Sequence, residues 1–531
     1  MTMSAPFRTV KSIEEWKSHG LEFSVPLNRY RWSDSKELRQ AAVEALGWCG
    51  LDNTRSGYKS VSHRLMKVIL LNLFSTYLKS PTMFCGYSRD STDYALDPRY
   101  NPTRFSFKAV KLIDAMANQG TESLIENYKG VQFGKFKRQA RMRLTPLGVI
   151  HLMRVFDVTP EIAAEVGPQE CIILRDRDPS IRDKDSKNKK QLDIPYDDTP
   201  KTIQMRRRLS AYNDLISRSD IEVRQFPAEG IPRGDGQEPY MLDYSRNKLR
   251  RIFSNGSWSE GGRFYGAWWI DLPEDWRQMI YIDGKRINEH DYSAIHPVIA
   301  YAFEGLNIFE ELGSDPYYLP ECETFPKLRS LLKVILNTAL NSKSSASAVS
   351  SANKEINFKP DKYKWFRDSD LNVKVLLNKL IKRHKPIESW LGTNKSSLFQ
   401  YIDSVIADEV MREMTKQDIP ILAVHDSFIC AVDQSNLLKK TMEEAFQTSL
   451  KSMAKPTKEL STVIKSSGIT PERWNQFMGM KSGLGLDDFE SVMKFIGLNR
   501  LNPIDSEIEE RLSSEVALEE ERMAALDDND F

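Results

Sequence analysis

Apolar residues recur at helical spacing through most of the first 165 residues. Residues 123–148 then form two short alternating segments around a tip rich in Gly and Lys, and a new helix begins near Pro146. This order predicts a mainly helical domain over residues 1–165 that is similar to a winged helix-turn-helix. The helical stretches cover residues 38–48, 61–78 and 105–120.

The hairpin of such a domain contacts nucleic-acid phosphates, while one of its helices enters a groove. Winged folds also bind proteins, and a basic hairpin is often only a solvated surface, so these alternatives stay open. Among the basic residues of the hairpin, Arg141 and Arg143 are candidate nucleic-acid ligands. The full set that would line the wing is Lys129, Lys135, Lys137, Arg138, Arg141 and Arg143.

Residues 166–250 are predicted to form a charged linker and basic, thumb-like helices. The stretch 174–200 is charged and almost without apolar residues, which predicts a linker or a mobile loop. An amphipathic helix is expected over 201–219, where Arg206 and Arg207 are candidate nucleic-acid ligands. Strand-like and helical segments alternate from residue 251 to about residue 500.

Two carboxylates lie where predicted strands end or turn. A strand reaches Asp291 and a helix begins near His296, while Asp426 interrupts the apolar strand residues of 419–432. An unpaired carboxylate among apolar strands costs several kcal/mol unless a cation binds it. Both positions are therefore candidate metal ligands, although Asp426 could also occupy an ordinary hairpin turn.

The two segments resemble motifs A and C of the family A DNA polymerases and the related single-subunit phage-type RNA polymerases. Residues 291–296 are similar to the motif A pattern D-Y-S-x-I-x, and residues 425–427 read H-D-S, as in motif C of the RNA polymerases. Two further segments follow the order of the family, and a helix expected over 396–414 is like the one that precedes motif C. The matching residues of those two segments are Gly262, Arg263, Leu272, Pro273 and Arg277 before motif A, and Arg329 and Lys333 of an R-x3-K motif B.

The resemblance covers roughly residues 250–450 and implies an α+β right-hand polymerase. Its palm, with an antiparallel sheet, and its helical fingers would occupy residues 251–500. Asp291 and Asp426 would hold two Mg²⁺ ions, with Mn²⁺ as an alternative, for nucleotidyl transfer. The implied partners are a primer–template and nucleoside triphosphates.

The resemblance also implies roles for other residues. Arg329 and Lys333 would bind the triphosphate, with Lys333 also a catalytic proton donor, while an exposed basic helix face is the plain alternative. Arg263 and Arg277 would hold the nucleic-acid backbone, or else form salt bridges within the palm. His425 would steer the primer terminus or be a simple turn residue. The remaining nucleotide-binding candidates are Tyr292, Ser293, His296 and Asn341.

Two departures leave the sugar preference open. His296 stands where the DNA polymerases have Glu, and Asn341 stands where motif B has Tyr. The D-Y-S form of motif A favours DNA synthesis, and no paired-carboxylate pattern of a proofreading exonuclease occurs. We therefore favour a DNA polymerase without proofreading. A single-subunit RNA polymerase or primase-like enzyme, a catalytically inactive replication initiator and a plain transcription regulator are the alternatives.

Length, cysteine content and charge constrain the number of domains, the metal and disulfide chemistry and the role of the C-terminal residues. A chain of 531 residues predicts two to four domains. Five scattered cysteines and no CxxC pair argue against zinc and disulfides, and the absence of a signal peptide or membrane segment predicts a cytoplasmic protein. The net charge is +1, but residues 505–531 carry −9, leaving +10 on the rest. This acidic tail, expected to be disordered from residue 501, would compete with nucleic acid or only aid solubility.

Overall fold

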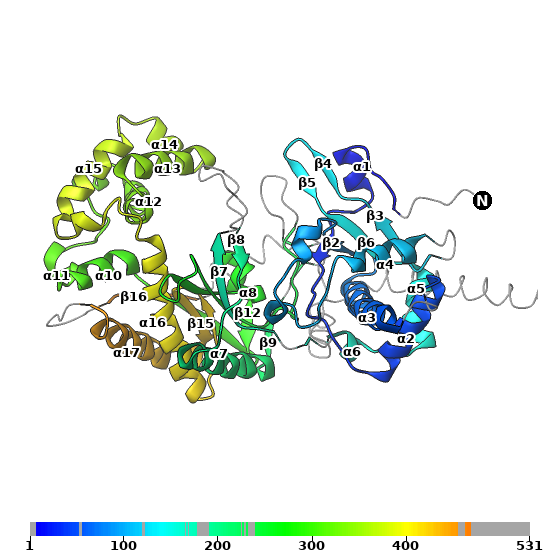
Figure 1. Cartoon of the computed structure of the whole chain (residues 1–531). Coiled ribbons are helices and arrows are strands. Elements are labelled where there is room, and N and C mark those ends of the chain that lie inside the picture. The colour runs from blue at the N-terminus through cyan, green and yellow to red at the C-terminus, as the bar shows by residue number, and fades with distance from the viewer. Residues whose placement is uncertain are drawn as a thin grey trace, which may run out of the picture. The chain divides into compact units, whose positions relative to one another are not determined.

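The chain folds into two compact units, coloured by residue number in Figure 1. The first comprises the described residues up to Glu170 together with Glu222–Arg246, and the second comprises Cys171–Ile221 and the described part of Asn247–Met478. Both mix helices with antiparallel strands, in agreement with the α+β prediction. The acidic tail lies outside the described residues. The computed structural model describes residues 7–51, 56–118, 123–164, 166–167, 169–177, 191–224, 226–227, 230–231, 239–454 and 462–468.

The first unit places helices against a four-stranded sheet of order β1-β2-β6-β3. β1 is parallel to β2, whereas β2 and β3 are both antiparallel to β6. α3 packs against α2, α4 and β6, and the apolar faces of these elements form the core. The main elements are β1 (Ser24–Pro26), α2 (Lys36–Trp48), α3 (Ser56–Lys79), β2 (Phe84–Tyr87), α4 (Lys108–Ala117), β3 (Ile125–Tyr128), β6 (Ala140–Leu144) and α5 (Pro146–Ile150).

Local sequence explains where these helices begin. The Ser35 hydroxyl caps α2 by accepting from the Leu38 amide, and Thr145 caps α5 in the same way ahead of Pro146. The predicted hairpin is present between β3 and β6 as β4 (Val131–Phe133) and β5 (Phe136–Arg138). The three helices and the basic hairpin predicted for this region are therefore confirmed as elements.

The second unit contains two sheets. The smaller has the order β11-β10-β7-β8, with β7 (Ile172–Arg177), β8 (Gln191–Asp193), β10 (Arg250–Phe253) and β11 (Gly261–Tyr265). The prediction of a linker over 174–200 is wrong at β7 and β8. Arg175 Nε donates a 2.7 Å hydrogen bond to Asp193, so a cross-strand ion pair stabilises a charged pair of strands that lacks apolar alternation.

The larger sheet has the order β14-β15-β13-β12-β9, and β16 also pairs with β13. β13 therefore lies between β15 on one side and β12 and β16 on the other. The strand, helix and hairpin predicted around the two candidate aspartates are confirmed. The strands are β9 (Ile221–Val223), β12 (Ile280–Ile282), β13 (Lys285–Tyr292), β14 (Ile421–Val424), β15 (Ser427–Ala431) and β16 (Ile464–Gly468).

Helices surround this sheet. α16 (Ser396–Lys416) packs against β11 and α17 (Ser435–Lys451), and α7 (Pro200–Arg218) packs against α16. A separate helical group consists of α12 (Leu328–Asn341), α13 (Ser345–Phe358) and α15 (Val373–Arg383), which Figure 1 shows gathered away from the sheets of the same unit. In the described part of the chain, no helix combines the length and apolarity needed to cross a membrane.

Candidate active site

Asp291 and Asp426 come together on the larger sheet. Asp291 lies on β13 directly opposite Ser427, the first residue of β15. Asp426 precedes Ser427 in the two-residue turn between β14 and β15, whose last register pair joins Val424 to Ser427. Directly opposed residues in an antiparallel pair are about 4.5–5.5 Å apart, so the two aspartates are close neighbours.

Their electrostatics fit a cation site. Burial and, after it, the charge of Asp426 raise the pKa of Asp291, while Lys465 and Lys333 act in the opposite direction. Neither carboxylate makes a hydrogen bond or ion pair with any residue that the structure describes. Two adjacent carboxylates without a cationic partner repel one another unless a cation or a proton is shared between them.

The backbone at both aspartates is unusual. His425 has φ +59° and Ala294, three residues after Asp291, has φ +55°. Such a left-handed conformation costs a residue with a Cβ atom roughly 1–2 kcal/mol. His425 and Asp426 form the two-residue turn between β14 and β15. Strained backbone of this kind is concentrated at functional sites.

The Arg263 side chain is only 18% exposed and binds a buried carboxylate. Its Nε lies 3.1 and 3.0 Å from the two carboxylate oxygens of Asp403, which is 2% exposed on α16. His296, on α10 (Ile295–Phe303), lies 3.2 Å from the same carboxylate and stacks on Phe399. The neighbouring Gly262 has φ +79°, and a Cβ there would lie 2.9 Å from two side chains, so glycine is required where β11 carries Arg263 to Asp403.

A second set of supporting hydrogen bonds centres on Glu289. Arg277 donates two hydrogen bonds of 3.1 and 2.9 Å to this buried carboxylate. The Ser427 hydroxyl donates a third, of 2.5 Å, to the same group. Arg263 and Arg277, predicted as ligands of the nucleic-acid backbone or else as salt-bridge residues, both form salt bridges inside the second unit.

The basic residues of α12 differ in their environment. Lys333 is exposed, makes no hydrogen bond or ion pair with a described residue, and its charge lowers the pKa of Asp291. Arg329, one turn earlier, is bound to Asp315 through Nε and Nη2 at 2.8 and 2.6 Å. Asn341 is at the end of the helix, where its amide donates to the Asn337 carbonyl.

Three other motif residues lie next to the aspartates but have structural contacts. Tyr292 is 3% exposed, donates a 2.6 Å hydrogen bond to the Met442 carbonyl and packs in the core. Ser293 is buried, and its amide donates to the Val463 carbonyl at 2.7 Å. His425 packs its ring against Tyr265, and burial is the main cause that lowers its pKa.

The basic residues predicted outside this site are dispersed. In the first unit, Arg141 is 3% exposed and donates a 3.0 Å hydrogen bond to the Leu21 carbonyl, while Arg143 binds Glu126. In the second unit, Arg206 binds Asp198 at 2.7 Å, whereas Arg207 is exposed. Arg141 and Arg143 lie on β6 and not on the β4–β5 hairpin, where Lys135 and Lys137 are exposed.

Sequence reasoning missed three residues of the site. Asp403 lies on the apolar face of α16 between Phe399 and Ile406. A buried carboxylate needs a partner, so its place among apolar residues could have identified it from the sequence. Glu289 shares the strand face of Asp291, two residues away, and could have been found from that spacing. Lys465 is opposite Asp291 on β16, a pairing that no local pattern indicates.

The chemistry of the aspartate pair suits hard divalent cations. Mg²⁺ prefers carboxylate and phosphate oxygens and keeps several waters, so two protein carboxylates suffice when a substrate supplies the rest. No cluster of three or more His, Cys, Asp or Glu residues able to hold a metal occurs in the described ranges. The pair therefore fits ions shared with a phosphate substrate and does not fit a closed structural metal site.

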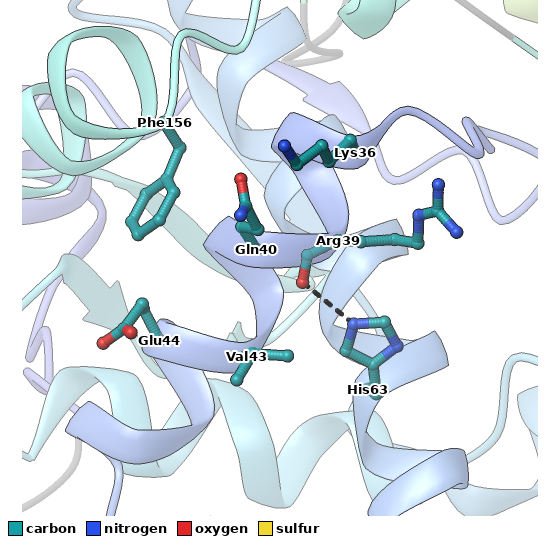
Figure 2. A pocket seen from close by; sticks show the side chains of 7 residues that line it. All are labelled: Lys36, Arg39, Gln40, Val43, Glu44, His63 and Phe156. Carbon is teal, nitrogen blue, oxygen red and sulfur yellow. Dashed lines mark hydrogen bonds between the residues drawn. The ribbon is translucent and has the colours of Figure 1, made fainter.

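A pocket of about 380 Å³ lies in the first unit. Figure 2 shows Lys36, Gln40 and Val43 of α2 on one side, with the ring of Phe156 across from them. The His63 ring lies 3.0 Å from the Arg39 carbonyl. The lining mixes cations, a carboxylate and apolar groups, which by themselves indicate no reaction.

Comparison with known proteins gives little similarity. No family model and no curated protein matches the chain. Among solved structures, the chain is similar to the POL domain of Pol1 from M. smegmatis in complex with a DNA primer-template and dNTP, with 14% identity and a TM-score of 0.25. The match covers 42% of this chain and 48% of that one. It is thus a weak and partial resemblance to one DNA polymerase domain.

Proposed function

We propose that the second unit is a template-directed nucleotidyl polymerase, with DNA synthesis favoured over RNA synthesis and without proofreading. The observation that carries this proposal is the pair formed by Asp291 and Asp426. Asp291 lies on β13, Asp426 lies in the turn that leads into the neighbouring strand β15, and neither makes an ion pair with a described residue, whereas the nearby carboxylates Asp403 and Glu289 are bound by arginines.

Asp291 and Asp426 would hold two divalent cations, which when bound supply charge stabilisation at the attacking and leaving oxygens. The reaction joins the primer 3′-oxygen to the α-phosphorus and breaks the bond to the β-phosphate, so that pyrophosphate leaves. Lys333, which has no partner among the described residues, would bind the triphosphate and give a proton to the leaving group.

The surrounding residues would act mainly by positioning. Arg263 and His296 both bind Asp403. These contacts fix β11, the start of α10 and α16 to one another. Glu289 joins Arg277 to Ser427, which fixes the hairpin that carries Asp426. Sites held by such supporting contacts keep reacting groups in place at little entropic cost.

We also propose that the first unit binds the nucleic acid as a winged helix. The chain order α3, β2, α4, β3, β6 and the sheet order β2-β6-β3 support this interpretation. Two short 3₁₀ turns, η1 (Ser91–Tyr94) and η2 (Pro98–Tyr100), occupy the place of a helix between β2 and α4. The exposed Lys135 and Lys137 would contact phosphates.

Primer extension by the purified chain tests the proposed activity. With Mg²⁺ and a primed template, we expect extension with dNTPs in preference to rNTPs, and loss of extension in Asp291→Ala and Asp426→Ala with nucleic-acid binding retained. Extension with rNTPs only would favour the RNA polymerase alternative. If the unaltered chain binds the primed template but does not extend it, the result would favour the alternative of a catalytically inactive replication initiator.

A further inference from the structure

Lys465 occupies a position next to the candidate catalytic carboxylates that the motifs do not include. β16 pairs antiparallel with β13, and the register sets Lys465 directly opposite Asp291. Opposed residues of such a pair project from the same face of the sheet, with Cβ atoms about 4.5–5.5 Å apart. Lys465 is exposed and forms no hydrogen bond or ion pair with the residues that the structure describes.

The strand that carries Lys465 is held firmly at this register. The Ser293 amide donates a 2.7 Å hydrogen bond to the Val463 carbonyl at one end. On the opposite face of the sheet, Ser466 is hydrogen-bonded to Nδ1 of the fully buried His290 at 2.7 Å. The ladder continues to Asn288 opposite Gly468, so the ammonium group extends from an ordered strand and not from a loose loop.

The strands β15 and β16 flank Asp291 on opposite edges of β13. β15, which follows His425 and Asp426, pairs with one edge of β13, and β16 pairs with the other. In an in-line displacement, the attacking hydroxyl and the leaving pyrophosphate lie on opposite sides of the α-phosphorus. With the primer terminus at the hairpin of Asp426, the β16 side of Asp291 is the side of the leaving group.

Charge balance points the same way. The two aspartates and a triphosphate carry roughly six negative charges, of which two divalent cations neutralise about four. On α12, Arg329 is already bound by Asp315, whereas Lys333 makes no ion pair with a residue that the structure describes. Lys465 lies opposite Asp291 across the β13–β16 ladder and therefore supplies a second cation beside these carboxylates, from a different element than Lys333.

We propose that Lys465 is a second cationic ligand, beside Lys333, for the polyphosphate of the incoming nucleotide and for the pyrophosphate that leaves. The inference rests on the proposed polymerase function, because it takes the polyphosphate as the anion at this site. The primer backbone is the other phosphate source within reach of a lysine, and the test separates the two.

Lys465→Ala and Lys465→Arg are compared with Lys440→Ala, a matched exposed lysine on α17 whose partner is Glu444. Three quantities are measured on the full chain. They are the KM and kcat for the nucleotide in primer extension, the Kd of inorganic tripolyphosphate with Mg²⁺ by calorimetry, and the Kd of primer–template without nucleotide.

Loss of one charge-assisted contact is expected to raise both the nucleotide KM and the tripolyphosphate Kd about 10-fold in Lys465→Ala. Lys465→Arg should recover most of this loss, and Lys440→Ala should behave as the unaltered chain. Primer–template affinity should stay within about twofold in all three variants. Thermal unfolding of each variant shows whether β16 is still folded.

Unchanged tripolyphosphate affinity in Lys465→Ala overturns the inference, as does a selective loss of primer–template affinity. If the unaltered chain extends primers and Lys465→Ala does so with unchanged constants, the inference fails while the polymerase function stands. If the unaltered chain binds tripolyphosphate but extends nothing, and Lys465→Ala loses that binding, the ligand assignment stands while the polymerase function fails.

Discussion

Asp291 on β13 and Asp426 in the β14–β15 turn lie side by side on one sheet, and, after burial, the charge of Asp426 is the main cause that raises the pKa of Asp291. This pair differs from the other carboxylates around it. Asp403 and Glu289 are bound by Arg263 and Arg277, so their charges are balanced within the fold. Asp291 and Asp426 make no ion pair with a described residue, so their mutual repulsion is an electrostatic strain that a bound cation or a proton relieves.

This strain predicts that Asp291→Asn stabilises the metal-free protein. A raised carboxyl pKa means that the folded state binds the proton more tightly than the unfolded chain, so stability falls as the pH rises above the usual Asp pKa. At pH 7–8 in EDTA, denaturant titrations should give a higher free energy of unfolding for Asp291→Asn than for the unaltered chain. Added Mg²⁺ should stabilise the unaltered chain more than the variant. A variant less stable in EDTA than the unaltered chain would show that the strain is absent.

Lys333 and Arg329 should separate activity from stability, although they lie one turn apart on α12. Lys333→Ala removes no contact to a described residue and should raise the nucleotide KM about 10-fold with a change in unfolding free energy below about 0.5 kcal/mol. Arg329→Ala also removes the ion pair with Asp315, which lies at 2.6 Å, and should cost up to about 1 kcal/mol of stability in addition. Equal stability losses in both variants would contradict this distinction.

The Arg263–Asp403 pair is expected to be structural. Arg263→Ala leaves a carboxylate that is 2% exposed without its main partner, and should destabilise the second unit by about 3–5 kcal/mol. The double variant Arg263→Met/Asp403→Leu removes both charges and should recover a large part of that loss in thermal unfolding. If Arg263→Ala weakens primer–template binding while leaving stability unchanged, Arg263 is instead a direct backbone ligand.

Local patterns predicted the elements of this chain better than its long-range pairings. The strand ending at Asp291, the hairpin at Asp426 and the helix carrying Lys333 follow from hydrophobic periodicity and short motifs. The pairing of β16 with β13 joins segments about 175 residues apart, and no local pattern encodes it. The linker predicted over 174–200 failed at β7 and β8, because Arg175 and Asp193 form a cross-strand ion pair that hydropathy cannot reveal.

Acid should destabilise the second unit through His384. This residue is fully buried, with Nε2 donating to the Pro316 carbonyl at 2.9 Å and Nδ1 accepting from Tyr301 at 3.1 Å. Burial lowers its pKa to about 4, so the imidazole is neutral when folded but gains a proton when unfolded. As the pH falls from about 6.5 to 4, this group alone should cost up to about 3 kcal/mol of stability.

His384→Gln keeps a donor for Pro316 and cannot titrate. Relative to the unaltered chain, this variant should take up about one proton fewer on unfolding at pH 5, measured from the slope of unfolding free energy against pH. An unchanged slope would assign the acid sensitivity to other groups. His290, whose pKa burial also lowers to about 4, is the natural second test.

The first unit offers a matched pair of tests for nucleic-acid binding. Lys135→Ala and Lys137→Ala change exposed lysines of the β4–β5 hairpin, and each should weaken binding and reduce the slope of log K against log salt by about 1. Arg141→Met should leave that slope unchanged but destabilise the unit by about 1–3 kcal/mol, since the Leu21 carbonyl loses its buried donor. Salt slopes unaffected by both lysines would favour a protein-binding role for the hairpin.

The central claim is that Asp291 and Asp426 act as one unit in holding divalent cations. The most direct measurement is a Mn²⁺ titration followed by electron paramagnetic resonance, in the presence of a non-reactive nucleotide analogue. Asp291→Asn, Asp426→Asn and the double variant are compared with the unaltered chain. We predict tight Mn²⁺ binding that each single variant loses and that the double variant loses no further, because residues acting together are not additive. Independent, additive losses, or unchanged Mn²⁺ binding in either single variant, would contradict the account.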